Sequence, residues 1–154
     1  TDILFEYRGT LDKYIGDAVM AFWGAPVPLK NHAILAADAC LKMMEKVHEL
    51  NLDLKNDPQY RVFKEKNLSI DIGIGLNSGI MTVGNMGSEV RKNYTIMGDN
   101  VNLGSRLEGV NKVYSTNIIV SESTYELVKK LPVKIYELLD RKEGVTSETI
   151  RKLD

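Results

Sequence analysis

Apolar residues recur along the chain with two different spacings, which predicts a mixture of helices and strands. In 31–51 they return every three or four residues, with Lys and Glu opposite them, and this pattern predicts an amphipathic helix. Residues 1–7 show the same spacing briefly and look like the end of another helix. Small residues fill the first half of the longer helix, so we expect it to approach a sheet closely.

A β-hairpin is predicted directly after the first helix. Two short apolar runs, 11–15 and 18–23, meet at Gly16-Asp17, a pair typical of the turn between antiparallel strands. Pro26 follows, and because proline has no backbone donor, the second strand is expected to end before it.

A strand with one nearly bare face is predicted at 68–76. Leucine and isoleucine alternate there with polar residues and glycines, which is the two-residue period of a strand. Gly73 and Gly75 share one face, and since glycine has no side chain, another backbone can approach that face.

The remaining segments alternate between short strands and helices. We expect a polar connection at 51–67, strands at 80–83, 93–97, 116–120 and 133–138, a polar loop at 84–92, and helices at 100–110, 121–130 and 147–153. Hairpins and crossovers are mixed in this order. The pattern therefore predicts an α+β sandwich, with helices packed on one face of a mixed, mainly antiparallel sheet.

Composition narrows the class of protein without indicating a function. The 154 residues carry 20 Lys and Arg against 21 Asp and Glu, a net charge of −1, which argues against a nucleic-acid partner or a polybasic membrane surface. The longest apolar runs fall far short of the roughly 18 residues of a membrane-spanning helix. Cys40 is the single cysteine and cannot form an intrachain disulfide, which fits a reducing compartment.

The first candidate site lies in 12–17. A carboxylate at the tip of a tight hairpin, here Asp17, is well placed to bind a divalent cation that keeps water and phosphate ligands. Lys13 lies four residues earlier on the strand and could point into a pocket. The alternative is an ordinary turn aspartate and a solvated lysine, because Gly-Asp turns are common.

The second candidate site lies in 93–106. If a helix begins near Asn100, then Asn102 and Arg106 stand four residues apart on one helix face. An amide and a guanidinium at this spacing could orient a sugar oxygen and stabilise charge on a phosphoryl group. The alternative is a helix-capping Asp99 or Asn100 with Arg106 as a surface residue.

Several other active-site types are disfavoured. The glycines match neither a phosphate-binding P-loop nor a dinucleotide-binding fingerprint, and no Gly-x-Ser-x-Gly hydrolase motif is present. His32 and His48 lie too far apart in sequence to form a local metal pair, and Cys40 lies on the apolar face of its predicted helix.

Taken together, the two candidate segments resemble the catalytic domains of class III nucleotidyl cyclases. The run 13–26 (KYIGDAVMAFWGAP) resembles the hairpin signature of that family, and 94–108 (YTIMGDNVNLGSRLE) resembles its second signature. The runs 73–79 (GIGLNSG), 83–88 (VGNMGS) and 117–121 (NIIVS) are also similar, in the same order. The likeness covers roughly 1–130 and implies a ferredoxin-like sandwich, with 1–154 forming one catalytic domain.

The resemblance also implies roles for individual residues. Asp17 matches the second of two aspartates that hold two Mg²⁺ or Mn²⁺ ions, and Lys13 matches the lysine that contacts the purine. Thr95 stands where many adenylyl cyclases have an aspartate that pairs with adenine. Lysine with threonine is similar to a bicarbonate-associated adenylyl cyclase subclass. Asn102 and Arg106 match the pair that orients the ribose and stabilises the transition state.

The family further implies ATP as substrate and a homodimer with shared active sites. Asp17 of one chain would then face Lys13, Thr95, Asn102 and Arg106 of the other. We expect a cytoplasmic catalytic domain under the control of a regulatory domain elsewhere in a longer parent protein, which could itself be membrane-tethered.

Two parts of the family pattern are not found in the sequence. The first metal-binding aspartate would precede residue 1, and a late hairpin with a basic residue would follow 130. Since the other site residues are intact and the chain lacks an initiator Met, we expect the chain to be part of a longer protein. Two alternatives stay open: a degenerate cyclase homology domain that binds nucleotide or dimerises without turnover, and a guanylyl cyclase.

Overall fold

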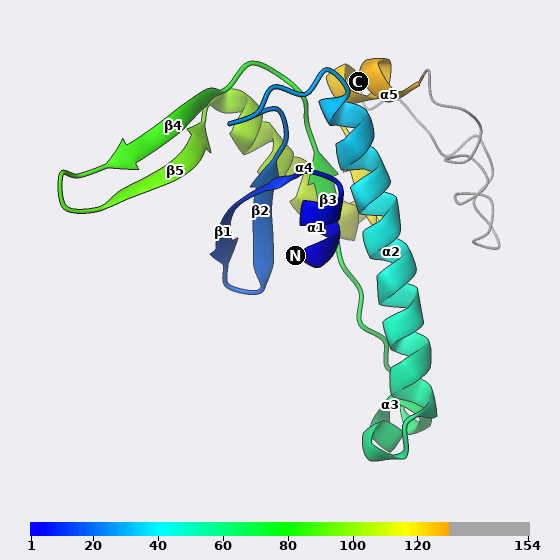
Figure 1. The fold of residues 1–154 in the computed structure, drawn as a ribbon. Helices are drawn as coiled ribbons and strands as arrows, with labels where there is room; N and C mark the ends of the chain where they lie inside the picture. The colour runs from blue at the N-terminus through cyan, green and yellow to red at the C-terminus, as the bar shows by residue number, and fades with distance from the viewer. Residues whose placement is uncertain (130–154) are drawn as a thin grey trace.

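Two antiparallel hairpins and one parallel strand pair form the β structure, and helices pack beside them (Figure 1). A computed structural model describes residues 1–129. Strands β1 (Thr10–Ile15) and β2 (Ala18–Phe22) form the first hairpin, and β4 (Thr82–Gly87) and β5 (Lys92–Met97) form the second. Strand β3 (Ile74–Leu76) pairs in parallel with β6 (Ile118–Val120). The mixed α+β fold predicted from the sequence is confirmed, although these strands form three separate pairs within the described residues.

The first hairpin matches its prediction closely. Ile15 pairs with Ala18 across a two-residue turn, and Gly16 takes a positive φ of 63°, which glycine adopts at little cost. The short helix α1 (Asp2–Glu6) precedes it, as expected for 1–7. The Trp23 indole donates a hydrogen bond of 2.8 Å to the carbonyl of Tyr7, and this bond holds the end of the hairpin against α1.

The long helix α2 (His32–Asn56) extends five residues beyond the predicted end at 51. Nothing in 51–56 interrupts a helix, whereas Asp57 precedes Pro58 and takes an extended conformation, with ψ of 120°. A 3₁₀ turn, η1 (Pro58–Tyr60), and a short helix, α3 (Arg61–Glu65), then fill the segment predicted as a polar connection.

The strand predicted at 68–76 is much shorter in the structure. Only Ile74–Leu76 pairs with another strand, and the preceding residues run beside α2 without a strand partner among residues 1–129. The side chain of Asn51 bonds instead to both backbone groups of Ile70, with distances of 2.8 and 2.7 Å. An alternating pattern therefore identified an extended segment, but extended backbone becomes a strand only where another strand pairs with it.

The prediction of a polar loop over 84–92 is wrong in extent, because most of this segment belongs to the second hairpin. Strand β4 continues to Gly87, so that the loop is only 88–91, and the hairpin projects away from the other elements (Figure 1). Polar residues are tolerated in these strands because most of their side chains are exposed. Backbone pairing, rather than an alternating apolar face, defines this hairpin.

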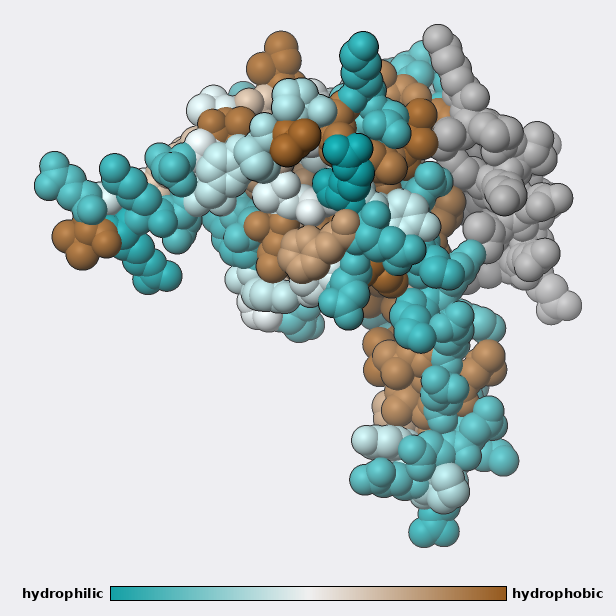
Figure 2. All heavy atoms as spheres, viewed as in Figure 1, coloured by the Kyte–Doolittle hydropathy of each residue, from teal (hydrophilic) through white to brown (hydrophobic). Residues whose placement is uncertain are grey.

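Small residues form much of the interior. The first half of α2 buries alanines and Cys40, and Ala33 and Ala37 pack with Val128 and Leu76. This packing confirms that the small residues of α2 allow a close approach to a strand. Apolar side chains are exposed farther along the molecule, where α2 and α3 form a protruding end (Figure 2); they include Leu50, Leu52, Val62 and Leu68.

The two helices that follow the second hairpin are α4 (Asp99–Tyr114) and α5 (Glu122–Val128). Helix α4 is longer at both ends than the predicted 100–110. Helix α5 begins as predicted after Ser121, whose hydroxyl accepts a hydrogen bond from the Thr124 backbone N–H at 3.3 Å. The strand predicted at 133–138, the helix predicted at 147–153 and the late hairpin of the family pattern lie outside the described residues.

Candidate active site

A β-bulge at Asp12 shapes the candidate site. Leu11 pairs with Ala21 and Lys13 pairs with Met20, two neighbours on β2, so Asp12 is an extra residue in β1. Neighbouring side chains of a regular strand point to opposite faces. The bulge breaks this alternation, and the side chains of both Asp12 and Lys13 reach Thr95 on β5.

Short polar contacts join these three side chains. The Thr95 hydroxyl lies 2.6 Å from Asp12 Oδ2, which also accepts a hydrogen bond of 3.3 Å from the Ile96 backbone N–H. Lys13 Nζ donates to Thr95 Oγ1 at 3.3 Å and lies 3.3 Å from Asp12 Oδ1. These contacts connect strand β1 of the first hairpin to strand β5 of the second.

Burial divides the cluster into an inner and an outer part. The side chain of Asp12 is 0% exposed and Thr95 is 8% exposed, whereas the Lys13 side chain is 47% exposed. Asp12 Oδ1 accepts no hydrogen bond within residues 1–129, and Lys13 is the cation beside it. Asp12 was not assigned a role from the sequence. A sequence signal for its role did exist: two successive charged residues stand in an otherwise apolar strand. This is unusual unless a bulge turns the side chain of one of them to the other face.

The second predicted pair lies on α4, and glycines of β3 set the position of that helix. A Cβ atom on Gly75 would lie only 2.3 Å from both Glu108 N and Gly104 O, so the backbones are in direct contact. The prediction that a backbone approaches the glycine face is thus confirmed. Asn111, 3% exposed, donates a hydrogen bond of 3.0 Å to the Ile74 carbonyl and fixes the same helix.

Asn102 and Arg106 therefore project from a firmly packed helix, four residues apart and exposed. Asp17 is exposed at the tip of the first hairpin. Within residues 1–129, the structure brings Lys13 and Thr95 into contact, but no hydrogen bond or ion pair joins either of them to Asp17, Asn102 or Arg106.

A divalent metal ion would find one suitable ligand in this hairpin. The Asp17 carboxylate is exposed, it has no side-chain partner within residues 1–129, and carboxylate oxygen is the donor that Mg²⁺ and Mn²⁺ prefer. No group of three His, Cys, Asp or Glu side chains in the described part of the chain is placed to hold a metal. Asp17 thus fits as one ligand, and these residues do not complete a metal site.

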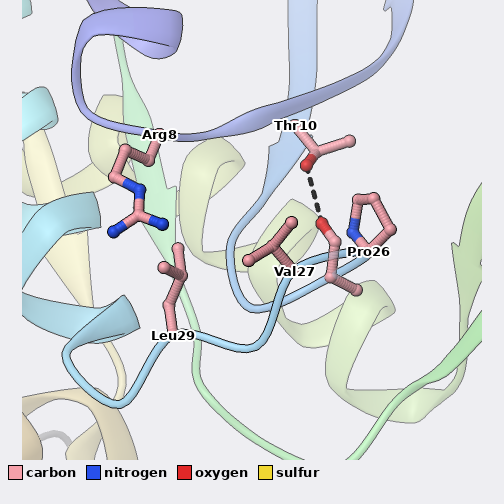
Figure 3. A pocket seen from close by; sticks show the side chains of 6 residues that line it. Arg8, Thr10, Pro26, Val27 and Leu29 are labelled. Carbon is pink, nitrogen blue, oxygen red and sulfur yellow. Dashed lines mark hydrogen bonds between the residues drawn. The ribbon is translucent and has the colours of Figure 1, made fainter.

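Two other features lie apart from this site. Arg8, Thr10, Ala25, Pro26, Val27 and Leu29 line a hollow of about 150 Å³, shown in Figure 3, where the Thr10 hydroxyl donates to the Ala25 carbonyl at 2.7 Å. This volume is below the range of about 300–1,000 Å³ that is usual for ligand pockets, and none of the predicted site residues lines it. Cys40 is 4% exposed, and burial raises the pKa of its thiol to about 12, which agrees with a core role.

Comparison with known protein families identifies the domain. The family model described as the adenylate and guanylate cyclase catalytic domain matches residues 6–146. The chain belongs to this family. The sequence resemblance to class III cyclases is thereby confirmed. Within the part of this cyclase domain that the structure describes, no helix is long and apolar enough to cross a membrane.

Curated relatives include adenylate cyclases from two bacteria. The chain is 33% identical to "Adenylate cyclase 1" of Rhizobium meliloti over 79% of this chain and 17% of that protein. It is also 33% identical to "Adenylate cyclase" of Anabaena cylindrica, over 77% of this chain and 22% of that protein. The chain thus spans less than a quarter of the length of either relative.

Solved structures similar to the chain include both adenylyl cyclases and guanylyl cyclases. The adenylyl cyclase CyaB from P. aeruginosa matches with a TM-score of 0.66 and 31% identity, covering 84% of this chain and 63% of that one. The guanylyl cyclase Cya2 matches with a TM-score of 0.66 and 31% identity, covering 82% and 59%. The catalytic core of a rhodopsin-guanylyl cyclase with converted specificity, in complex with ATPalphaS, matches with a TM-score of 0.62 and 32% identity, covering 84% and 62%.

Proposed function

We propose that this cyclase domain converts ATP to 3′,5′-cyclic AMP and pyrophosphate. The observation that carries the proposal is the contact between Lys13 Nζ and Thr95 Oγ1 at 3.3 Å, across 82 residues of sequence. These are the two residues that the family pattern assigns to the purine, and they meet in one place. Adenylate cyclase relatives at 33% identity add support for ATP.

Different residues of this chain would contact the base, the sugar and the phosphate of the nucleotide. Lys13 and Thr95 would bind the purine edge, and Asn102 would orient the ribose through its side-chain amide. Arg106 would stabilise the negative charge that builds on the α-phosphoryl oxygens, and one such donor contributes about 3–4 kcal/mol to transition-state stabilisation. Since Asn102 and Arg106 share one face of α4, a single helix would align the sugar with the reacting phosphate.

In the proposed reaction, the ribose 3′-oxygen forms a bond to the α-phosphorus and the bond to the departing pyrophosphate breaks. Two Mg²⁺ or Mn²⁺ ions, when bound, would supply Lewis acidity to the 3′-hydroxyl and to the triphosphate. Asp17 would contribute one carboxylate ligand, and the other ligands would come from outside residues 1–129. The near-zero net charge of the chain fits a site in which a few placed cations meet the anionic substrate.

Turnover of ATP by the natural full-length protein in the presence of Mn²⁺ tests the proposal. We expect cyclic AMP from the wild type and a loss of activity of about 100-fold or more in Arg106→Ala, from the size of one transition-state contact. Asp17→Ala should lose activity as well, whereas Asp53→Asn, an exposed carboxylate on α2, should not. Absence of product, or an Asp17→Ala variant as active as the wild type, would contradict the proposal.

A degenerate cyclase homology domain is the second candidate, because residues 1–129 supply no complete metal site. Such a domain would bind nucleotide or dimerise and yield no cyclic product at any metal concentration. A guanylyl cyclase is the third candidate, because the chain is also similar to the guanylyl cyclase Cya2. Turnover of ATP and GTP before and after Lys13→Glu separates these possibilities, because a carboxylate at position 13 would exchange a donor for an acceptor.

We also propose that two copies of the domain share their active sites. No hydrogen bond or ion pair joins Asp17 to Lys13, Thr95, Asn102 or Arg106 within the described residues, which fits its use in the site of a second copy. Asp17→Ala and Arg106→Ala proteins, each inactive alone, should then recover activity when mixed. If confirmed dimers form in the mixture and activity does not return, the sites are not shared.

A further inference from the structure

The hydrogen bonds around Thr95 fix the direction in which its hydroxyl points. A hydroxyl has one proton to donate and two lone pairs. In the 2.6 Å contact the Thr95 hydroxyl donates its proton and Asp12 Oδ2 accepts it. Lys13 Nζ, an ammonium without lone pairs, uses one lone pair of Thr95 Oγ1 at 3.3 Å. One lone pair of Thr95 remains, and it can only accept.

Lys13 has a complementary capacity. Its ammonium carries three N–H groups. Thr95 Oγ1 and Asp12 Oδ1, both at 3.3 Å, engage at most two of them, and about half of the side chain is exposed. The cluster therefore keeps one unused acceptor position on Thr95, beside at least one unused donor on Lys13.

From this geometry we propose that Asp12 is a positioning residue that sets the purine specificity of the domain by holding Thr95 as an acceptor. The inference rests on the proposed function, in which Lys13 and Thr95 meet the purine. A purine with an amino group at carbon 6 offers a donor at that position and an acceptor at ring nitrogen 1, which complements the pair. A 6-oxopurine offers an acceptor and a donor in the same places, so it would set lone pair against lone pair and N–H against N–H.

The supports of Asp12 explain why it can impose this direction. Its side chain is fully buried, and Oδ2 accepts from the Ile96 backbone N–H as well as from Thr95. Burial and the backbone donor restrain the orientation of the carboxylate, and the β-bulge directs it toward β5. Without Asp12, the Thr95 hydroxyl would be free to rotate and to donate to a 6-oxo group.

The ratio of kcat/KM for ATP to that for ITP measures this effect, because the two nucleotides differ in the base at position 6 and at ring nitrogen 1. We expect Asp12→Ala in the natural full-length protein to lower the ratio about tenfold. A tenfold change corresponds to about 1.4 kcal/mol, which is the contribution of one hydrogen bond. Asp12→Asn should keep most of the ratio, because an amide oxygen can accept the same two hydrogen bonds. The control Asp53→Asn should leave it unchanged.

A double-mutant cycle separates positioning from a merely structural role. Thr95→Val removes the acceptor and should lower the ratio by itself, and Asp12→Ala should then have no further effect on it. An unchanged ratio in Asp12→Ala, or an equal further drop on the Thr95→Val background, would overturn the proposal.

Wild-type protein gives a test that does not depend on the folding of a variant. Affinities measured by calorimetry should fall in the order ATP, purine riboside triphosphate and ITP, because the second lacks the donor and the third presents a repelling acceptor. If ITP binds as well as purine riboside triphosphate, Thr95 is not a fixed acceptor and the proposal is wrong. Failure of the proposed function is a separate result, namely no cyclic product from ATP or GTP. The ratio of ATP affinity to ITP affinity, compared between the wild type and Asp12→Ala, tests the role of Asp12 even then.

Discussion

Replacing Gly75 by alanine should disturb both the stability of the domain and the geometry of the proposed active site. The added Cβ would lie 2.3 Å from Glu108 N and from Gly104 O, whereas ordinary van der Waals contact begins near 3.4 Å. Backbone atoms of β3 and α4 would therefore have to separate by about 1 Å. Overpacking of this kind costs about 3 kcal/mol, which corresponds to a fall in Tm of about 6–12 °C for a domain of this size.

The same displacement should lower activity beyond the loss of stability, because α4 carries Asn102 and Arg106. A misplacement of about 1 Å can reduce turnover about 100-fold, so we expect cyclase activity measured well below Tm to fall by that order. Gly109→Ala is the matched control: it lies on α4 with nothing within 4 Å of the added Cβ, and it should be neutral or stabilise by up to about 1 kcal/mol. Equal Tm values for the two variants would refute the assumed contact between β3 and α4.

Three further predictions concern residues outside the proposed chemistry. Asn111→Ala should lower the free energy of unfolding by about 1–3 kcal/mol in denaturant titration, because the Ile74 carbonyl loses its buried donor; an unchanged midpoint would contradict this. Ser121→Ala should cost about 1 kcal/mol through loss of the cap on α5, and a loss near zero would show that the cap is dispensable. Cys40 should not react with a thiol reagent at neutral pH until the protein unfolds, since burial raises the pKa of its thiol to about 12; rapid reaction of the native protein would count against this burial.

Local patterns were sufficient to predict the elements whose geometry depends on neighbouring residues. The Gly16-Asp17 turn, the cap at Ser121 and the small-residue face of α2 all lie where the sequence indicates. Gly73 and Gly75 even predicted a close backbone approach. The partner of that approach, α4, could not be identified, because a bare face does not specify which element covers it.

Predictions failed where structure depends on distant pairing. The alternation in 68–76 predicts a full strand, yet only its last three residues find a partner among the described residues. The β4–β5 hairpin was missed beyond 83 because its strands carry polar residues on exposed faces. Asp12 was missed for a related reason: the two successive charged residues at 12 and 13 are a local signal of a bulge, but which of them turns toward Thr95 depends on the register between β1 and β2.

Competition between ATP and GTP tests the central claim most directly. The natural full-length protein is supplied with equal concentrations of both nucleotides and Mn²⁺, and cyclic AMP and cyclic GMP are quantified in the same sample by mass spectrometry. With Lys13 and Thr95 arranged as a donor beside an acceptor, cyclic AMP should exceed cyclic GMP by about tenfold or more. Comparable amounts of the two products, an excess of cyclic GMP, or no cyclic product at all would contradict an adenylate cyclase.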